Sequence, residues 1–322
     1  MVKIDSKDRE ILYQLDVDSR QSFARIGNKV GLSKTVVAYR VNKLIENGII
    51  KTFYTVIDAF KLGYISFRIY LVYQYMTQEK EREIISYFIN QKLNWWTISA
   101  EGRFDLAVIM WVRDINEFYS FWEETLKQFR DYFLEQQFSV YIQLYSYRYS
   151  YLLDDVKKSD RTKFEITGGG TQVTIDELDF RLLRLIAPNA RMPVKEIAKR
   201  LNTTVAVVNY RIKKLMKADV IQGFRSDMDL TTLGYQFFKA DIDLKDYKQR
   251  GKIINYVKTN PHLVRIDKSV GISDLELEFH VISLGQFHDI MKDLVNKFPD
   301  VIKKYRYVYA SKLHKMNYMP EA

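Results

Sequence analysis

Two short basic segments hold the side chains best suited to chemistry, and they suit contact with a polyanion. In each segment, apolar residues recur at helical spacing and leave an outward face of small, polar and aromatic residues. That face is expected to hold Lys34, Thr35, Ala38, Tyr39 and Asn42 in the first segment and Val205, Ala206, Asn209, Tyr210 and Lys213 in the second. Such a helix fits the major groove of duplex DNA, where side chains reach the base edges. Four further cations are placed for contacts with phosphates, namely Arg40, Lys43, Arg211 and Lys214.

Basic charge is confined to the two regions that contain these segments. The chain has 322 residues and a formal net charge of +10. Residues 1–55 hold ten Lys and Arg against six Asp and Glu, and residues 172–226 hold eleven against five, so the remainder carries no net charge. A membrane-surface protein more often concentrates its charge on one amphipathic helix or tail. Two compact basic modules therefore favour two DNA-reading heads and no membrane partner.

Each outward-facing segment is expected to be the third helix of a three-helix head. In the first head, Asp5 and Ser33 are suited to cap the first and third helices, and a second helix is expected over residues 22–30. A tight turn precedes the third helix, at Gly31 in one head and at Asn202 in the other. A β-rich stretch follows and predicts a wing. A trihelical protein-interaction module with ordinary solvated cations is the alternative, and the confinement of charge to both heads favours DNA.

The chain repeats itself. An offset of 171 positions aligns residues 3–64 with residues 174–235 without a gap, and 18 of the 62 pairs are identical. Beyond this region the offset becomes 169, as in Gly102 against Gly271. So long a period indicates a duplicated two-domain unit and not a solenoid. The predicted domains are a winged helix-turn-helix at 1–58, an α+β domain at 59–153, a flexible linker at 154–173, a second winged helix-turn-helix at 174–229 and a second α+β domain at 230–322.

The neutral regions have the pattern of ferredoxin-like domains. Runs of β-branched and aromatic residues predict strands, and amphipathic stretches between them predict helices, in the order βαββαβ. The last strand of each domain is expected at 138–147 and at 301–309, and a helix at 247–259. The predicted fold class is therefore α+β, with two winged helix-turn-helix domains and two ferredoxin-like domains.

Other chemistries find little support in the residues. The chain has no cysteine, which excludes disulfides and thiolate sites. Its four histidines lack the spacing of a metal motif, and no phosphate-binding loop occurs, so no metal, cofactor or enzymatic activity is predicted. The longest apolar run, at 106–112, is too short to cross a bilayer, and the N-terminus lacks a signal-peptide core. A cytoplasmic, nucleoid-associated protein is the expectation.

In its heads the sequence resembles the Lrp/AsnC (feast/famine) transcription regulators of bacteria and archaea. The resemblance rests on Asp5-x-x-Asp8, on Gly31-Leu32-Ser33, on Val37-x-x-Arg40-Val41-x-x-Leu44, and on their second-copy counterparts Asp176-x-x-Asp179 and Val208-x-x-Arg211-Ile212-x-x-Leu215. It implies sequence-specific binding of double-stranded DNA and regulation of transcription. The second copy departs from the pattern with Asn202-Thr203 and Ala218-Asp219, which puts its DNA affinity in doubt.

The same resemblance implies that the α+β domains are the family's effector domains, called RAM domains. In that family a Gly-x-aromatic-Asp turn helps to bind a small amino acid at a subunit interface. The first copy matches with Gly102, Phe104 and Asp105, whereas the second keeps only Gly271 and Asp274. These residues are the predicted effector site, although Gly-x-x-Asp also suits an ordinary hairpin turn.

Because family members dimerise through RAM domains, the two copies are expected to form a pseudo-dimer, within one chain or between chains. Unequal third helices then predict an asymmetric operator, since equal halves read a palindrome. Two other functions stay open. One is an architectural DNA-binding protein without an effector; the other is an enzyme similar to siroheme decarboxylases, which share this architecture but need Arg and His around a tetrapyrrole.

Overall fold

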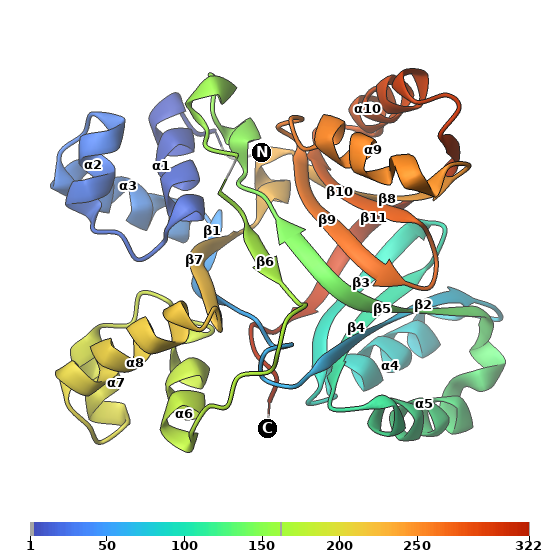
Figure 1. The fold of residues 1–322 in the computed structure, drawn as a ribbon, viewed down its shortest axis with the longest axis horizontal. Helices are drawn as coiled ribbons and strands as arrows, with labels where there is room; N and C mark the ends of the chain where they lie inside the picture. The colour runs from blue at the N-terminus through green and yellow to red at the C-terminus, as the bar shows by residue number, and fades with distance from the viewer. Residues whose placement is uncertain (1–2, 162, 322) are drawn as a thin grey trace.

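Two three-helix heads lie beside a large sheet in the computed structural model, which describes residues 3–161 and 163–321 (Figure 1). The first head holds α1 (Ser6–Val17), α2 (Phe23–Val30), α3 (Lys34–Glu46) and the strand β1 (Ile50–Ile57). The second holds α6 (Glu177–Ile186), α7 (Val194–Arg200), α8 (Val205–Lys217) and β7 (Ile221–Met228). Both are winged helix-turn-helix folds, as the sequence predicted.

Local capping explains where the helices of the heads begin. The Asp5 side chain accepts the Asp8 backbone N–H at 2.8 Å and Asp8 accepts the Asp5 N–H in return, a reciprocal cap for α1. Ser33 caps α3 through the Val36 N–H. The turn before the third helix needs a left-handed residue, and Asn202 takes this conformation in the second head with φ of 52°, where Gly31 has φ of 70° in the first. The fold therefore tolerates the Asn substitution.

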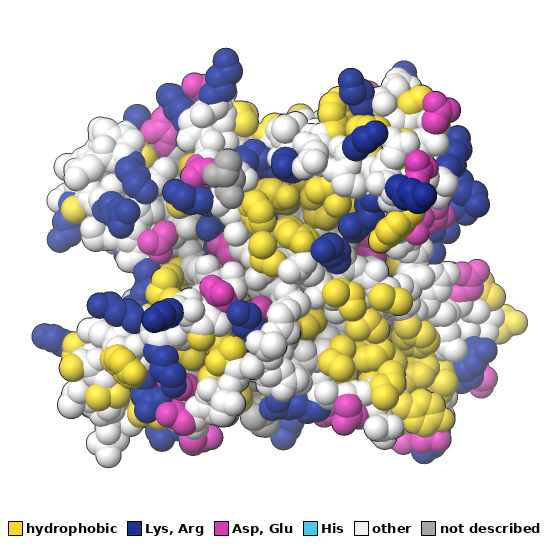
Figure 2. Space-filling model, viewed as in Figure 1, with side chains coloured by type: hydrophobic (Ala, Val, Ile, Leu, Met, Phe, Trp, Pro, Cys, Tyr) yellow, Lys and Arg dark blue, Asp and Glu magenta, His cyan; other side chains and the backbone are white. Residues whose placement is uncertain are grey.

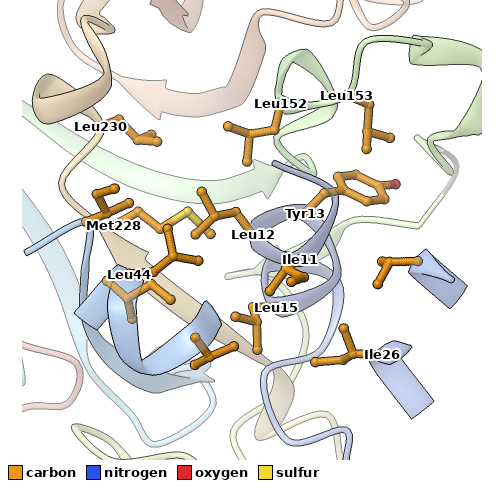
Figure 3. Close-up of a cluster of buried hydrophobic side chains, with 14 of the residues drawn as sticks. Ile11, Leu12, Tyr13, Leu15, Ile26, Leu44, Leu152, Leu153, Met228 and Leu230 are labelled. Atoms are coloured by element: carbon orange, nitrogen blue, oxygen red, sulfur yellow. The ribbon is translucent and has the colours of Figure 1, made fainter. Parts of the chain in front are cut away.

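The two heads complete each other through an antiparallel ribbon of β1 and β7. The paired residues run from Ile50 opposite Met228 to Ile57 opposite Ile221. As a result, the core of the first head includes Met228 and also Leu230 from the second copy, which lie against its helices (Figure 3). Neither head would bury its apolar face fully without the other copy.

Two βαββαβ units form the rest of the molecule. The first contains β2 (Ile65–Tyr73), α4 (Gln78–Ile89), β3 (Asn94–Gly102), β4 (Leu106–Val112), α5 (Ile115–Phe129) and β5 (Phe133–Ser146). The second contains β8 (Gln236–Leu244), α9 (Arg250–Val257), β9 (Leu263–Val270), β10 (Leu275–Val281), α10 (Leu284–Lys297) and β11 (Ile302–Met316). Short 3₁₀ turns lie at η1 (Arg130–Tyr132), η2 (Ser150–Leu152), η3 (Val156–Lys158), η4 (Leu230–Leu233) and η5 (Tyr247–Gln249).

The two units join into one closed sheet. The strand order is β2-β4-β3-β11-β8-β10-β9-β5-β6, and β5 also pairs with β2, which closes the ring. Closure depends on two long strands, because β5 pairs first with β2 and then with β9, while β11 pairs first with β8 and then with β3. The predicted strand 301–309 ended before most of the residues of β11 that pair with β3 of the other unit. The predicted strand 138–147 contained the part of β5 that pairs with β9 of the other unit but missed residues 133–137, which pair with β2. The two copies thus pair within one chain in this structure.

The segment 154–173 is not the flexible tether that its glycines suggested. It contains η3 and the strand β6 (Glu165–Thr167), which pairs with β5 at the edge of the sheet. The backbone N–H of Gly168 donates to both carboxylate oxygens of Asp58 at 3.1 Å. A side chain at Gly168 would meet the Ile142 carbonyl oxygen at 2.5 Å, so this glycine is required by a close approach. The segment is therefore fixed to the first α+β unit through β5 and to the end of the first head through Asp58.

Charged side chains are buried where the two units meet. Arg68 of β2, which is 1% exposed, donates from Nη2 to Glu276 Oε1 of β10 at 2.7 Å. Lys239 of β8 lies 2.8 Å from the other Glu276 oxygen. Burial disfavours the carboxylate, but the two cations outweigh it and hold the pKa of Glu276 below its ordinary value. The interior of the closed sheet therefore joins a cation of the first copy to carboxylates of the second.

Candidate nucleic-acid interface

The third helices present the residues that the sequence placed outward. On α3, Lys34, Thr35 and Asn42 are exposed, and Tyr39 is 62% exposed with Lys43 Nζ 5.8 Å from its ring centroid. On α8, the exposed set is Val205, Ala206, Asn209, Tyr210 and Lys213. Ala38 is half-buried. The opposite faces are buried, with Val37, Val41 and Leu44 on α3 and Val208, Ile212 and Leu215 on α8. Each helix thus offers a continuous outer face (Figure 2 shows Lys and Arg over both heads).

Two of the arginines that were expected to contact phosphates form ion pairs within their own heads. Arg40 Nη1 lies 2.8 Å from carboxylate oxygens of both Asp5 and Asp8, at the start of α1. Hydrogen bonds to these carboxylates raise the Arg40 pKa. Its counterpart Arg211 makes the same contacts with Asp176 and Asp179 at 2.7 Å. Both arginines join the third helix to the first in this structure, and the phosphate contact expected of them stays a prediction.

Lys214 is also drawn inward, because its Nζ lies 2.9 Å from Asp179 Oδ2. Hydrogen bonding to that carboxylate raises the Lys214 pKa, although the side chain is still 44% exposed. Its counterpart Lys43 instead lies beside the exposed ring of Tyr39. The cations best placed for phosphates are therefore Lys34 and Lys43 on α3 and Lys213 on α8.

The second head's recognition face borders a groove between the heads. Asn209 and Lys213 of α8 line this groove together with Arg20, Ser22 and Arg25 of the first head. A strand of phosphates entering here would meet cations from both copies. Arg20 and Arg25 were not predicted as candidates, because Arg20 precedes α2 and Arg25 lies in its first turn, so neither belongs to a third helix.

A symmetric pair of arginines connects the heads. Arg191 of the second copy lies over the Phe23 ring at 4.4 Å and donates to the Gln21 carbonyl oxygen at 3.2 Å. Arg20 of the first copy lies over the Phe224 ring at 5.1 Å. Burial lowers the pKa of both guanidinium groups. Arg20 and Arg191 are identical in the repeat, and this identity was the signal in the sequence. The paired heads explain it, because each arginine contacts the other head.

The predicted effector turns lie where the two α+β units meet, and the structure gives each residue a packing role. A side chain at Gly102 would meet the Tyr307 carbonyl oxygen at 2.8 Å, and one at Gly271 the Phe138 carbonyl oxygen at 2.5 Å. Asp105 accepts the Tyr73 N–H at 2.7 Å, and Asp274 accepts the Leu244 N–H at 2.8 Å. Phe104 is buried and stacks on Tyr70 at 4.6 Å. The glycines therefore permit the two copies to approach, and the carboxylates hold strand ends.

Among residues 3–161 and 163–321, no group of three or more His, Asp and Glu side chains is arranged to hold a metal ion. No helix in these same ranges has the length and apolarity needed to cross a membrane.

Comparison with known proteins connects this geometry to a class. A family model described as winged helix-turn-helix DNA-binding matches residues 4–51 and 175–222. An HTH-type transcriptional regulator of Pyrococcus furiosus is 34% identical over 125 residues, which cover 38% of this chain and 78% of the relative. The regulatory protein AsnC of Haemophilus influenzae is 23% identical over 128 residues, covering 39% and 85%.

A solved structure matches nearly the entire chain. The crystal structure of the siroheme decarboxylase NirDL with an iron-uroporphyrin III analogue has a TM-score of 0.65 and 14% identity, and the match covers 98% of this chain and 94% of that one. At this identity the match shows the shared architecture of two fused winged-helix and ferredoxin-like units, and it says nothing of shared chemistry.

Two winged helix-turn-helix heads, with exposed third helices and cations around them, define a DNA-binding protein. The chain belongs to the Lrp/AsnC-type family of HTH transcriptional regulators, in tandem-duplicated form. It is a DNA-binding transcription regulator of that type.

Proposed function

We propose that this regulator binds a specific, asymmetric double-stranded DNA site, with one unequal half-site for each head. The observation that carries the proposal is the contrast between the two outer faces of α3 and α8. Lys34 in one helix stands where Val205 stands in the other, and Asn42 where Lys213 stands, while Tyr39 and Tyr210 are equivalent. Since both heads belong to one paired chain, their unequal faces are presented together to one duplex.

Base reading is assigned to the exposed side chains near the start of each helix. In the first head these are Lys34, Thr35, Ala38 and Tyr39, and in the second Val205, Ala206, Asn209 and Tyr210. Apolar residues such as Val205 and Ala206 suit the thymine methyl group, whereas Asn209 suits adenine. The two half-sites should therefore differ in composition.

In vitro selection of DNA sites at near-physiological salt tests the proposal. We expect one non-palindromic consensus that the full chain binds with a steep salt dependence. A Lys34→Ala/Tyr39→Ala variant should lose preference in one half of that site alone, and an Asn209→Ala/Tyr210→Ala variant in the other half. A perfect palindrome would contradict the proposal and indicate two chains meeting through the same copy. Equal affinity for selected and random DNA would instead support the architectural alternative.

Modulation by a small amino-acid-like effector is the finer part of the proposal, with the turns at Gly102–Asp105 and Gly271–Asp274 as its site. Their position between the two α+β units supports it, since a ligand there would touch both copies. One carboxylate oxygen of Asp105 already accepts the Tyr73 backbone N–H, and one of Asp274 accepts the Leu244 backbone N–H. An amino-acid screen against the selected DNA site tests this, and Asp105→Asn should remove any response that the turn mediates.

A further inference from the structure

A cavity of about 120 Å³ lies where the ribbon of β1 and β7 meets the end of the closed sheet. Its walls come from four parts of the chain: the ribbon, the segment after β1, the closed sheet, and the residues at the end of β11. It lies apart from the outer faces of α3 and α8 and from the predicted effector turns, none of whose residues line it. The DNA-binding proposal makes no use of it.

The wall that the first copy supplies is aromatic. Trp95 and Trp111 stack with ring centroids 5.0 Å apart and an interplanar angle of 8°. Phe60 lines the cavity beside them, and Tyr54 of the ribbon stacks on Tyr318 at 4.8 Å. Flat aromatic walls favour a flat ring as an occupant, through offset or edge-to-face contacts.

The wall that the second copy supplies is polar. Arg265 of β9 and Glu278 of β10 are cross-strand neighbours, with Arg265 Nη1 3.2 Å from Glu278 Oε2. Among the described residues, Glu278 is the ion-pair partner of Arg265. The Arg265 side chain is 31% exposed and lines the cavity. Burial lowers the Arg265 pKa, but the nearby carboxylates of Glu278 and Asp267 outweigh it, so the group stays a cation. Its remaining N–H groups suit a carboxylate.

His280 completes this wall without adding positive charge. Its Nδ1 lies 2.7 Å from the Tyr151 hydroxyl. Burial, together with the charges of Arg265 and Arg225, lowers its pKa to about 3. Arg225 lines the cavity as well, but its guanidinium group already donates hydrogen bonds to Asp16 and to the Tyr147 carbonyl oxygen. Arg265 is therefore the cation available to an occupant.

We propose that this cavity binds a small molecule that carries one aromatic ring and one carboxylate, with the ring against Trp95 and Trp111 and the carboxylate on Arg265. The volume limits the occupant to a single ring, because an apolar cavity of about 150 Å³ accepts benzene and this cavity, of about 120 Å³, is smaller. A tetrapyrrole is several times too large for it. Such a ligand would also touch the ribbon that joins the two heads, so its occupancy would stiffen β1 and β7.

Benzoate is the probe for a direct test on the full chain, by titration calorimetry and by tryptophan fluorescence. We expect saturable binding of one benzoate per chain and a change in the emission of Trp95 and Trp111. Acetate lacks the ring, and benzyl alcohol lacks the charge, so each should bind at least about tenfold more weakly. Hydrogen exchange of the β1 and β7 amides should slow with benzoate and not with acetate. None of these three readouts involves DNA, so the outcome is independent of the proposed DNA binding.

Two variants and a matched control keep the test decisive. Arg265→Gln should weaken benzoate binding by at least about tenfold, whereas Arg306→Gln, which removes an arginine paired with Asp243 elsewhere on the same sheet, should not. Ser146 lies opposite Arg265 in the register of β5 and β9, on the same face, so Ser146→Leu should fill the cavity and block binding with Arg265 intact.

Thermal unfolding checks that each variant folds. Unsaturable benzoate binding, equal affinity in the folded Arg265→Gln or Ser146→Leu variant, or displacement of benzoate by uroporphyrin would overturn the proposal.

Discussion

The two copies of the repeat keep the contacts that fold a head and differ in the contacts that face outward. Asp5, Asp8 and Arg40 form the same ion-paired link as Asp176, Asp179 and Arg211. In contrast, the outer faces of α3 and α8 differ at most positions. Identity at these aspartates and arginines therefore marks structural contacts, whereas the outer faces, apart from the shared Tyr39 and Tyr210, differ and allow the two heads of one chain to take separate roles.

The two α+β units differ in their interior in a complementary way. Glu276 and Asp267 of the second copy stand where the repeat places Ala107 and Ile98 in the first. Arg68 of the first copy pairs with both carboxylates, at 2.7 Å and 3.5 Å. Two first copies pairing with each other would bury two arginines without these carboxylates, at a cost of several kcal/mol for each unpaired charge. The buried charges thus favour pairing of unlike copies.

The largest expected effect comes from breaking this complementarity. Glu276→Ala restores the residue type of the first copy but leaves Arg68 and Lys239 without their shared carboxylate. We expect the free energy of unfolding to fall by about 3–5 kcal/mol, the range for removing one partner of a buried pair. Urea denaturation measures it. Glu83→Gln is the control, because its pair with Lys80 is exposed and should change stability by less than about 1 kcal/mol.

A compensating variant sharpens the same comparison. Arg68→Met combined with Glu276→Leu replaces the ion pair by apolar side chains, which is often neutral in buried sites. The double variant should therefore be more stable than Glu276→Ala. If it is equally unstable, the cost lies in lost packing and not in unpaired charge.

The next effect concerns a position that titrates in only one copy. His280 stands where the first copy has Trp111, and burial lowers its pKa to about 3. The unfolded chain binds a proton near pH 6.5 while the folded chain does not, so stability is intact above that pH and is lost as the pH falls toward 3. Between pH 7 and pH 5 we expect wild type to lose about 2 kcal/mol more than His280→Gln.

His262, whose pKa burial also lowers, is present in both proteins, so the difference between them isolates His280. Urea denaturation at each pH gives the two curves. Parallel curves would show that the imidazole is protonated in the folded chain, and the charge assigned to the cavity wall would then be wrong.

A smaller effect tests the outer faces through salt dependence. Lys34 and Val205 are equivalent positions, so the lysine can be removed from one head and added to the other. Lys34→Val should reduce the slope of log affinity against log salt by about 0.9, and Val205→Lys should raise it by about 0.9. The double variant should restore the original slope while altering both half-site preferences. Electrophoretic mobility shifts over a salt series would measure this, and unchanged slopes would remove the third helices from the phosphate contact.

Sequence patterns predicted the heads well and the closure of the sheet poorly. Helix caps such as Ser33 and apolar spacing such as Val37, Val41 and Leu44 are local signals, and the structure confirms the winged helix-turn-helix folds that they indicated. The second half of β11 was not predicted, because its partner β3 belongs to the other copy. The second half of β5 was predicted as a strand, but its pairing with β9 of the other copy was not. For the same reason the cavity was not predicted: its aromatic and polar walls come from residues more than 150 positions apart.

The smallest effect distinguishes a structural arginine from a DNA contact. Arg40→Ala should lower the free energy of unfolding by about 1 kcal/mol, because its ion pairs are partly exposed, and it should leave the salt slope of DNA binding unchanged.

Arg211→Ala should lower the free energy of unfolding by less, since Lys214 still pairs with the buried Asp179. Only removal of Arg211 and Lys214 together leaves that carboxylate without a cation among the described residues, so the double variant should be the least stable of the three. A salt slope reduced by about 0.9 in Arg40→Ala would mean instead that this arginine leaves Asp5 and Asp8 to bind a phosphate when DNA is present.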